Sequence, residues 1–453
     1  MQEFTEEPAP ASSIRQVAFA SFVGTTVEWY DFFIYGTSAA LVFPRLFFPE
    51  FSPFAATLAS FATFGVAFFA RPIGGVVFGH FGDRIGRKSM LVITLLIMGG
   101  ATFLIGLVPT FEQAGWAAPI FLVVLRFLQG FAVGGEWGGA TLIVVEHAPK
   151  ERRNFYASWP QTGLPVGLML STAVFAAFSL LPDEQFFSWG WRVPFLLSIV
   201  LIAVGLFIRL RVLESPVFSR VKALAVQSKV PLIEVLRDYP VSLVLAVGAV
   251  LGLITRFYVV TTFTLVYATE QLGVSRNVPL LGLLLFAAAQ LAGIVIFARV
   301  ADRISKRPVA LSSALINVLL SYPYFWLIDT EAAIWIWVAM SAQGFAGGAL
   351  YGIAGVFMAE LFPARLRYSG ISLGYQVAGL LGGALSPFIA TALVQWAEGA
   401  SWPVALYVTA TGIVTLMAIY FASEKYRVDI HDLQITEVSH TISARPIITK
   451  QTA

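Results

Sequence analysis

The chain contains no cysteine, and its 453 residues include only four histidines and 12% charged residues. Without cysteine the protein has no disulfide, no thiolate nucleophile and no thiolate metal ligand. The histidines (His80, His147, His431 and His440) are too scattered along the chain to predict a metal cluster. A soluble protein carries about 25% charged residues, so a deficit along the whole chain excludes a soluble domain with one anchor. No cofactor is expected.

Long apolar stretches fill the chain instead, and 58% of its residues are hydrophobic. A membrane-spanning helix needs about 20 mostly apolar residues, and only helices or closed barrels satisfy their backbone groups in lipid. The runs lack the alternation of barrel strands, which predicts an all-α membrane protein with twelve transmembrane helices. The predicted spans are 17–43, 53–79, 90–110, 117–146, 155–181, 191–210, 241–268, 279–300, 308–328, 332–359, 369–397 and 401–422.

Lysine and arginine predict how the spans are oriented. With the N-terminus inside, 23 of the 29 basic residues fall in inner segments, and three each fall in outer segments and within spans. Cytoplasmic loops collect positive charge, so we expect both termini in the cytoplasm of a bacterial inner-membrane protein. The first fifteen residues are acidic and polar, unlike a cleaved signal peptide, so we expect the first span to be retained.

The chain divides into two halves that resemble each other. Gly79-His-Phe-Gly-Asp83-Arg84-Ile-Gly86-Arg87-Lys88 recurs as Ala298-Arg-Val-Ala-Asp302-Arg303-Ile-Ser305-Lys306-Arg307, and Gln129-Gly-Phe-Ala-Val-Gly134-Gly135 recurs as Gln343-Gly-Phe-Ala-Gly-Gly347-Gly348. Repeated six-helix halves are typical of transporters that bind their substrate between the halves. We predict a first half over 1–210, a linker over 211–240, a second half over 241–423 and a disordered cytoplasmic tail over 424–453.

These motifs resemble those of a known family. The segment Gly79–Lys88 is similar to the loop motif of the major facilitator superfamily. Glu28-Trp-Tyr-Asp31-Phe, Arg71-Pro-Ile-Gly74, Arg126-Phe-Leu-Gln129-Gly130, Trp189-Gly-Trp-Arg192-Val-Pro194 and Glu360-Leu-Phe-Pro363-Ala-Arg365 resemble its metabolite:proton symporters, which include shikimate, α-ketoglutarate and proline/betaine carriers. The resemblance covers the whole chain, and the first half is most similar to the shikimate-type branch.

The resemblance implies a transporter that imports a small organic acid with protons by alternating access, and no enzyme activity. The proton is then the coupling ion. The expected partners are a small polar, anionic solute and the lipid bilayer, and no nucleic acid. The protein is expected to work as a monomer. Two other transporters remain open, a proton-coupled efflux antiporter and a proline/betaine-type osmolyte symporter. A membrane sensor that binds solute without moving it is a more remote alternative.

Charged residues within spans are rare and usually functional. Three are acidic (Glu28, Asp31 and Glu136), and they are the candidates for proton coupling. Burial disfavours the charged form of a carboxylate, as a proton carrier requires. The family resemblance favours Asp31. The alternative is a structural ion pair that holds the first span to the fourth.

Two basic residues within spans, Arg126 and Arg256, are candidates for substrate binding, because a guanidinium binds a carboxylate through two parallel hydrogen bonds. Arg126 alternatively keeps Asp31 ionised, and Arg256 alternatively pairs with Glu28 or Glu136. Polar and aromatic residues that we expect to line the pocket are Tyr30, Tyr35, Gln129, Trp159, Gln161, Tyr258, Tyr375 and Gln376. For each of these, ordinary packing is the alternative.

A third set of charged residues predicts gates between the halves. Arg71 lies within the second span and either faces the cavity or joins Glu136 in an inner gate. Asp83 is placed to cap a helix N-terminus, where the helix dipole favours an anion. The remaining gating candidates are Arg84, Arg87, Lys88, Glu146, Asp302, Arg303, Glu360 and Arg365, although basic residues at the inner surface also set the topology.

Overall fold

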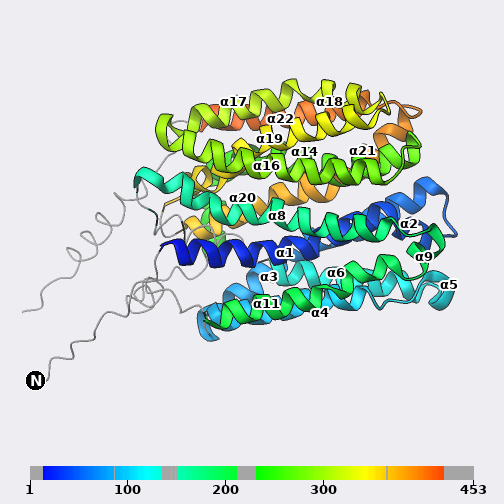
Figure 1. Ribbon diagram of the computed structural model, residues 1–453. Coiled ribbons are helices and arrows are strands. Elements are labelled where there is room, and N and C mark those ends of the chain that lie inside the picture. The colour runs from blue at the N-terminus through cyan, green and yellow to red at the C-terminus, as the bar shows by residue number, and fades with distance from the viewer. Residues whose placement is uncertain are drawn as a thin grey trace, which may run out of the picture.

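The computed structural model describes residues 14–85, 87–134, 144, 148, 150–211, 231–363 and 366–422. Within those residues the chain is helical and forms no strand. The helices run side by side in one long bundle, with α1–α11 together on one side and α14–α22 on the other (Figure 1). The predicted all-α fold is confirmed. The predicted tail and most of the predicted linker lie outside the described residues, and α13 (Pro231–Asp238) lies at the end of that linker.

Twelve helical rods cross the bundle in the described part of the chain, and each matches one predicted span. In the first group they are α1 (Ile14–Leu41), α3 (Pro53–Ile85), α4 (Arg87–Ile105), α6 (Ala117–Val133), α8 (Arg153–Ser179) and α10–α11 (Val193–Leu196 and Ser198–Arg211). In the second they are α14 (Pro240–Tyr258, extended by η3, α15 and η4 to Gln271), α16 (Asn277–Ile304), α17–α18 (Lys306–Leu319 and Ser321–Ile328), α19 (Ala333–Ala359), α20–η5–α21 (Arg367–Gly379, Leu380–Ala384 and Leu385–Trp396) and α22 (Trp402–Phe421).

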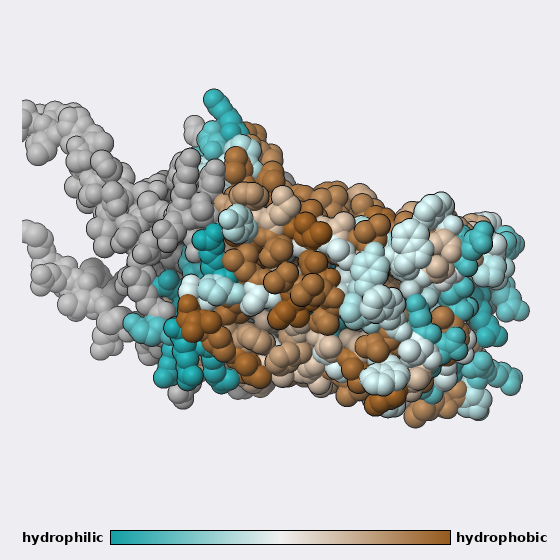
Figure 2. All heavy atoms as spheres, turned by 90° about the horizontal axis from the view of Figure 1, so that it is seen from above, coloured by the Kyte–Doolittle hydropathy of each residue, from teal (hydrophilic) through white to brown (hydrophobic). Residues whose placement is uncertain are grey.

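Hydrophobicity and length support insertion of these rods in a membrane. Eight helices of the described chain are long and apolar enough to span a bilayer, and α17 with α18, bent by 42°, makes a ninth. The bend has a local cause: Pro323, in the first turn of α18, has no N–H to continue the ladder of α17. Apolar atoms cover the middle of the visible surface, whereas hydrophilic residues gather at its two ends (Figure 2). Such a band matches a hydrocarbon core between two aqueous faces.

Glycines bring helices of one group into backbone contact. A Cβ added at Gly130 of α6 would lie 2.2 Å from the carbonyl oxygen of Ala67 in α3. A Cβ at Gly344, which the repeat pairs with Gly130, would lie 2.2 Å from the carbonyl oxygen of Phe286 in α16. Small residues at helix contacts are typical of membrane bundles, where backbones approach closely. The sequence repeat therefore corresponds to a repeated packing contact.

We expect Gly130→Ala to lower the stability of the fold by about 1–3 kcal/mol, because the new methyl group would collide with backbone that cannot move aside. Thermal unfolding of the purified protein in detergent measures the effect. Gly100→Ala is the matched control, since nothing lies within 4 Å of a Cβ at that helical position. Equal melting temperatures for the two variants would contradict the close contact.

Candidate functional site

Four of the six charged residues predicted within spans are enclosed by the bundle. Asp31 on α1 is 1% exposed, and Arg71 on α3, Arg126 on α6 and Arg256 on α14 are 4%, 0% and 2% exposed. Glu28 is half-buried on α1, and Glu136 lies outside the described residues. Enclosed charges are costly unless the protein or a ligand compensates them, so their surroundings define the candidate site.

A chain of polar contacts connects Asp31 to Arg126. The Nη1 of Arg126 donates to Oε1 of Gln129 at 3.0 Å, and Nε2 of Gln129 donates to the Thr102 hydroxyl at 2.7 Å. That hydroxyl lies beside Asp31 and donates its own hydrogen to the carbonyl oxygen of Met98 at 2.9 Å. Sequence reasoning allowed a direct Asp31–Arg126 pair. The structure instead joins the two residues through Gln129 and Thr102.

The Thr102 hydroxyl lies within reach of both Met98 and Asp31. Both carboxyl oxygens of Asp31 are enclosed. A hydroxyl has one hydrogen and two lone pairs, and Gln129 occupies one lone pair of Thr102. The single hydrogen can go to the Met98 carbonyl or to an Asp31 carboxylate, and the free lone pair can accept a hydrogen bond from the protonated acid. Thr102 can therefore bond Asp31 in either form, as a site that gains and loses a proton requires.

An aromatic cluster contacts the two central arginines and joins the two halves. The ring centroid of Phe32 is 4.7 Å from the guanidinium carbon of Arg71 and 4.3 Å from that of Arg126, which places the two cations within about 9 Å. Phe32, Phe64 and Phe68 of the first half all contact the ring of Tyr258 in the second, at centroid distances of 6.2, 5.8 and 5.5 Å. Cations over aromatic faces are stabilised by the ring quadrupole, so these rings partly replace water around both charges.

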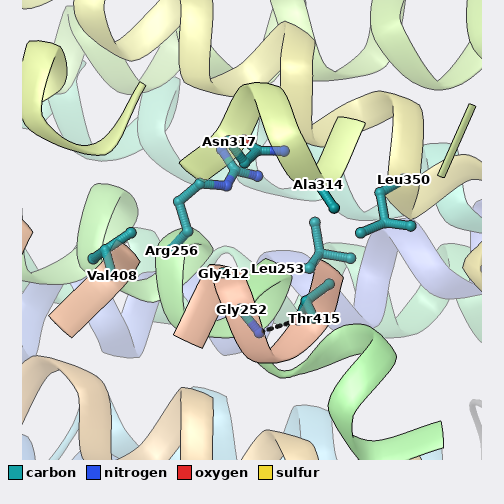
Figure 3. A pocket seen from close by; sticks show the side chains of 9 residues that line it. All are labelled: Gly252, Leu253, Arg256, Ala314, Asn317, Leu350, Val408, Gly412 and Thr415. Atoms are coloured by element: carbon teal, nitrogen blue, oxygen red, sulfur yellow. Dashed lines mark hydrogen bonds between the residues drawn. The ribbon is translucent and has the colours of Figure 1, made fainter. Parts of the chain in front are cut away.

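Arg256 turns into its own half. Its Nη1 donates to the backbone oxygen of Gln343 at 2.5 Å and to the side-chain oxygen of that residue at 3.1 Å. A small cavity of about 10 Å³ lies beside it, enough for about one water molecule. The residues that line it belong to α14, α17, α19 and α22 of the second half (Figure 3): Gly252, Leu253, Arg256, Ala314, Asn317, Leu350, Val408, Gly412 and Thr415. Contact between Arg256 and a substrate stays a prediction.

Four of the other predicted pocket residues lie near the central arginines or join the two halves. Tyr35 donates to Thr63 at 2.8 Å and lies against Arg126, and Tyr258 and Tyr375 are electrostatic neighbours of Arg71. The side chain of Gln376 reaches the backbone oxygen of Gly134 across the two halves at 3.5 Å. The other three make separate contacts or are buried: Tyr30 donates to the backbone of Pro194, Trp159 packs on Phe155, and Gln161 is buried on α8.

Both ends of α8 are held by charges from the other half. At its N-terminus Asp302 of α16 accepts from the backbone N–H groups of Asn154 and Phe155 at 3.0 and 3.1 Å. At its C-terminus Arg276, just before α16, donates to the carbonyl oxygen of Ser179 at 2.8 Å and to Asp183 at 2.8 Å. The helix dipole favours an anion at the first end and a cation at the second. Sequence reasoning singled out Asp302 but missed Arg276 and Asp183, because no motif surrounds them.

The remaining gating candidates are less informative. Glu360 pairs with Lys306 at 2.5 Å, within the second half, and Arg303 is exposed at the end of α16. The side chains of Asp83, Arg84, Arg87 and Lys88 lie outside the described part of the structure, as do Glu146 and Arg365. Their predicted roles stay predictions.

Known transporters are similar to this chain in sequence. The family model of the Major Facilitator Superfamily matches residues 21–387 and 245–444. The chain is 44% identical to the shikimate transporter of Escherichia coli over 92% of this chain and 96% of that protein. It is 40% identical to the inner membrane metabolite transport protein YhjE of E. coli, over 92% and 96%, and 31% identical to the proline/betaine transporter of E. coli, over 89% and 82%.

Solved structures agree on the architecture. The crystal structure of a D-xylose-proton symporter superimposes with a TM-score of 0.70 at 19% identity, covering 91% of this chain and 98% of that one. At that identity the likeness establishes the fold and leaves the substrate open. The predicted fold class is thereby confirmed, and the relatives confirm the resemblance to the shikimate-type branch. The protein is a multi-pass membrane transporter, not an enzyme, and it belongs to the major facilitator superfamily.

Proposed function

We propose that this protein is a proton-coupled symporter that imports a small organic acid across the inner membrane, and that Asp31 carries the proton. One observation carries the proposal: Asp31 is a carboxylic acid only 1% exposed inside the bundle, and Thr102 and Gln129 connect it to the buried Arg126. The names of the relatives support the substrate class, since the shikimate transporter moves an organic acid. The protein works as a monomer with both termini in the cytoplasm.

The contacts from Asp31 to Arg126 supply a route for coupling. Arg126 fixes the orientation of the Gln129 amide, and Gln129 in turn occupies a lone pair of Thr102. An anion that draws Arg126 away from Gln129 would free that amide to turn and change what Thr102 offers to Asp31. The charge of the substrate thereby acts on the proton site without direct contact between them.

Charge balance explains why the proton travels with an anion. When Asp31 is protonated, the centre of the first half keeps two cations, Arg71 and Arg126, beside one described carboxylate, Glu28. The one net positive charge of these described groups attracts one monoanion, and the loaded group then approaches neutrality. A neutral centre crosses between inward-facing and outward-facing states at the lowest electrostatic cost.

The charged contacts at the two ends of α8 are the proposed gates for alternating access. Asp302 closes the end that we assign to the cytoplasm, and Arg276 with Asp183 closes the other end. Each contact joins α8 of the first half to α16 of the second, and both are formed in this structure. Opening toward either side requires one of them to break while the other persists.

A second substrate class has support from the relatives named as proline/betaine transporters, at 31% identity over 89% of this chain. Proline and betaine also carry a carboxylate, which the same arginines would attract. Their added positive charge would meet Arg71 and Arg126 unfavourably, which favours a plain acid. The same uptake experiment compares the two classes directly.

We expect protein-dependent acidification of liposomes that contain an interior pH dye when an organic acid is added outside. Shikimate, α-ketoglutarate, proline and betaine form the panel, and empty liposomes correct for passive entry of acid. Acidification with shikimate and none with betaine is the expected pattern. If no member of the panel causes acidification, and the protein is shown to be inserted, the symport proposal is overturned and export is favoured.

Replacement of Asp31 by Asn should abolish proton-driven accumulation of the acid while leaving exchange of labelled for unlabelled solute. The amide keeps the shape of the side chain but carries no exchangeable charge. Counterflow and gradient-driven uptake, measured in the same liposomes, separate the two activities. Asp238→Asn, at an exposed position on α13, is the control and should behave as wild type. Surviving accumulation in Asp31→Asn would assign the proton to another group.

The two gates predict opposite shifts in conformation. Asp302→Ala removes the acceptor of two backbone N–H groups and should open the predicted cytoplasmic end, whereas Arg276→Gln should open the other end. Because the chain has no cysteine, spin labels attach at introduced cysteines alone. One label pair at positions 151 and 304 and another at 180 and 270 would report the two ends. Widening at the same end in both variants would contradict the assignment.

A further inference from the structure

Arg71 differs from the other buried arginines because nothing in the described structure bonds to it. Arg126 donates to Gln129 and to the backbone of Phe64, and Arg256 donates to Gln343. Arg71 makes no hydrogen bond and no ion pair with the described residues, and its Nε–H is an enclosed donor without a partner. An enclosed donor left unused is costly. A ligand that accepts from this fork would remove that cost.

The surroundings of Arg71 place it between the two halves. The rings of Phe32 and Phe68 lie 4.7 and 4.5 Å from its guanidinium carbon, and both belong to the first half. Its polar neighbours are three tyrosines of the second half and one acid of the first: Tyr258, Tyr351, Tyr375 and Glu28. A molecule bound at this guanidinium would therefore contact both halves together. Arg256, by contrast, faces only its own half.

We propose that Arg71 binds the carboxylate of the transported acid, and that Tyr258 and Tyr375 contact hydroxyl groups on the same molecule. This inference rests on the proposed symport of an organic acid and adds the chemical class of the substrate. A planar carboxylate matches the guanidinium fork, and phenol groups exchange hydrogen bonds with hydroxyls. The faces of Phe32 and Phe68 suit a flat carbon ring. The substrate class is a monocarboxylate on a hydroxylated ring.

The charges nearby set the number of carboxylates. The guanidinium carbons of Arg71 and Arg126 lie 4.7 and 4.3 Å from the centroid of the same Phe32 ring, so they are within about 9 Å of each other. Glu28 is an electrostatic neighbour of Arg71, so one negative charge is already present among the described groups. One substrate carboxylate completes the balance, whereas a dicarboxylate would leave an extra negative charge in a site poor in water.

Equilibrium binding to the full-length protein in detergent tests the proposal, with shikimate and its uncharged methyl ester as probes. Detergent removes the proton gradient, so binding is measured apart from coupling. Wild type should prefer the acid, and Arg71→Gln should lower the acid-to-ester preference at least tenfold, as expected for a lost charged hydrogen bond. Arg45→Gln is the control, since that arginine also lies over an aromatic ring, that of Phe187, but outside the candidate site. It should keep the wild-type preference.

The outcomes separate this inference from the proposed function. An unchanged preference in Arg71→Gln would overturn it, and so would an equal loss of both probes, which would make Arg71 structural. If Arg71→Gln does not fold, Arg71→Lys is measured instead. Lysine keeps the positive charge but loses the guanidinium fork, so the acid-to-ester preference should fall severalfold. An unchanged preference in Arg71→Lys would overturn the inference. Failure of wild type to bind or transport any acid of the panel would instead overturn the proposed function.

Discussion

The single hydrogen of the Thr102 hydroxyl is the constraint on which the proposed mechanism depends. The Met98 carbonyl and the Asp31 carboxyl group both lie within reach of that hydrogen, and Gln129 occupies one lone pair. The orientation of Gln129 is in turn fixed by Arg126, which needs the amide oxygen. A buried acid is thereby linked to a cation that it does not touch. Polar groups in a medium of low dielectric polarise one another, and a change at one end of such a chain alters the other.

The repeat gives the two halves a similar scaffold with different charges. The described part of the first half encloses Asp31, Arg71 and Arg126, whereas α14 of the second half encloses Arg256. Gln129 and Gln343 correspond, and each accepts a hydrogen bond from a buried arginine. The first half thus holds both the titratable acid and the arginine proposed for the solute carboxylate, whereas the second half presents phenols at the interface. The proposed proton site belongs to the first half alone, and the proposed solute site draws on both halves.

The sequence predicted the fold in nearly all respects, because lipid leaves a chain few options. Apolar runs predicted twelve helices, and most of the described ends agree within a few residues. The exceptions are α3, which continues to Ile85 instead of ending at residue 79, and the fourth span, whose predicted end lies outside the described residues. The sequence also identified the buried charges, since a charge within a span is conspicuous. It could not predict which way each side chain turns. The sequence made Arg256 a candidate for substrate binding, but its side chain faces its own half. It made Arg71 a candidate for a gate, and the neighbours of Arg71 come from both halves. Arg276 lay outside any span or motif, so only the packing of α8 against α16 revealed it.

The two proposed gates lie at opposite ends of one helix, α8, so opening at one end competes with opening at the other. α8 has 27 residues and spans about 40 Å, so the contacts at its ends are separated by most of the membrane. Pro160 and Pro165 interrupt its hydrogen-bond ladder and allow it to bend between them. The two contacts are chemically alike, since each sets a charge from the second half against an end of the same helix dipole. Contacts of similar strength leave the two open states close in free energy, and a few kcal/mol of differential substrate binding then suffices to select between them. A transporter that must open to both sides in every cycle requires that near balance.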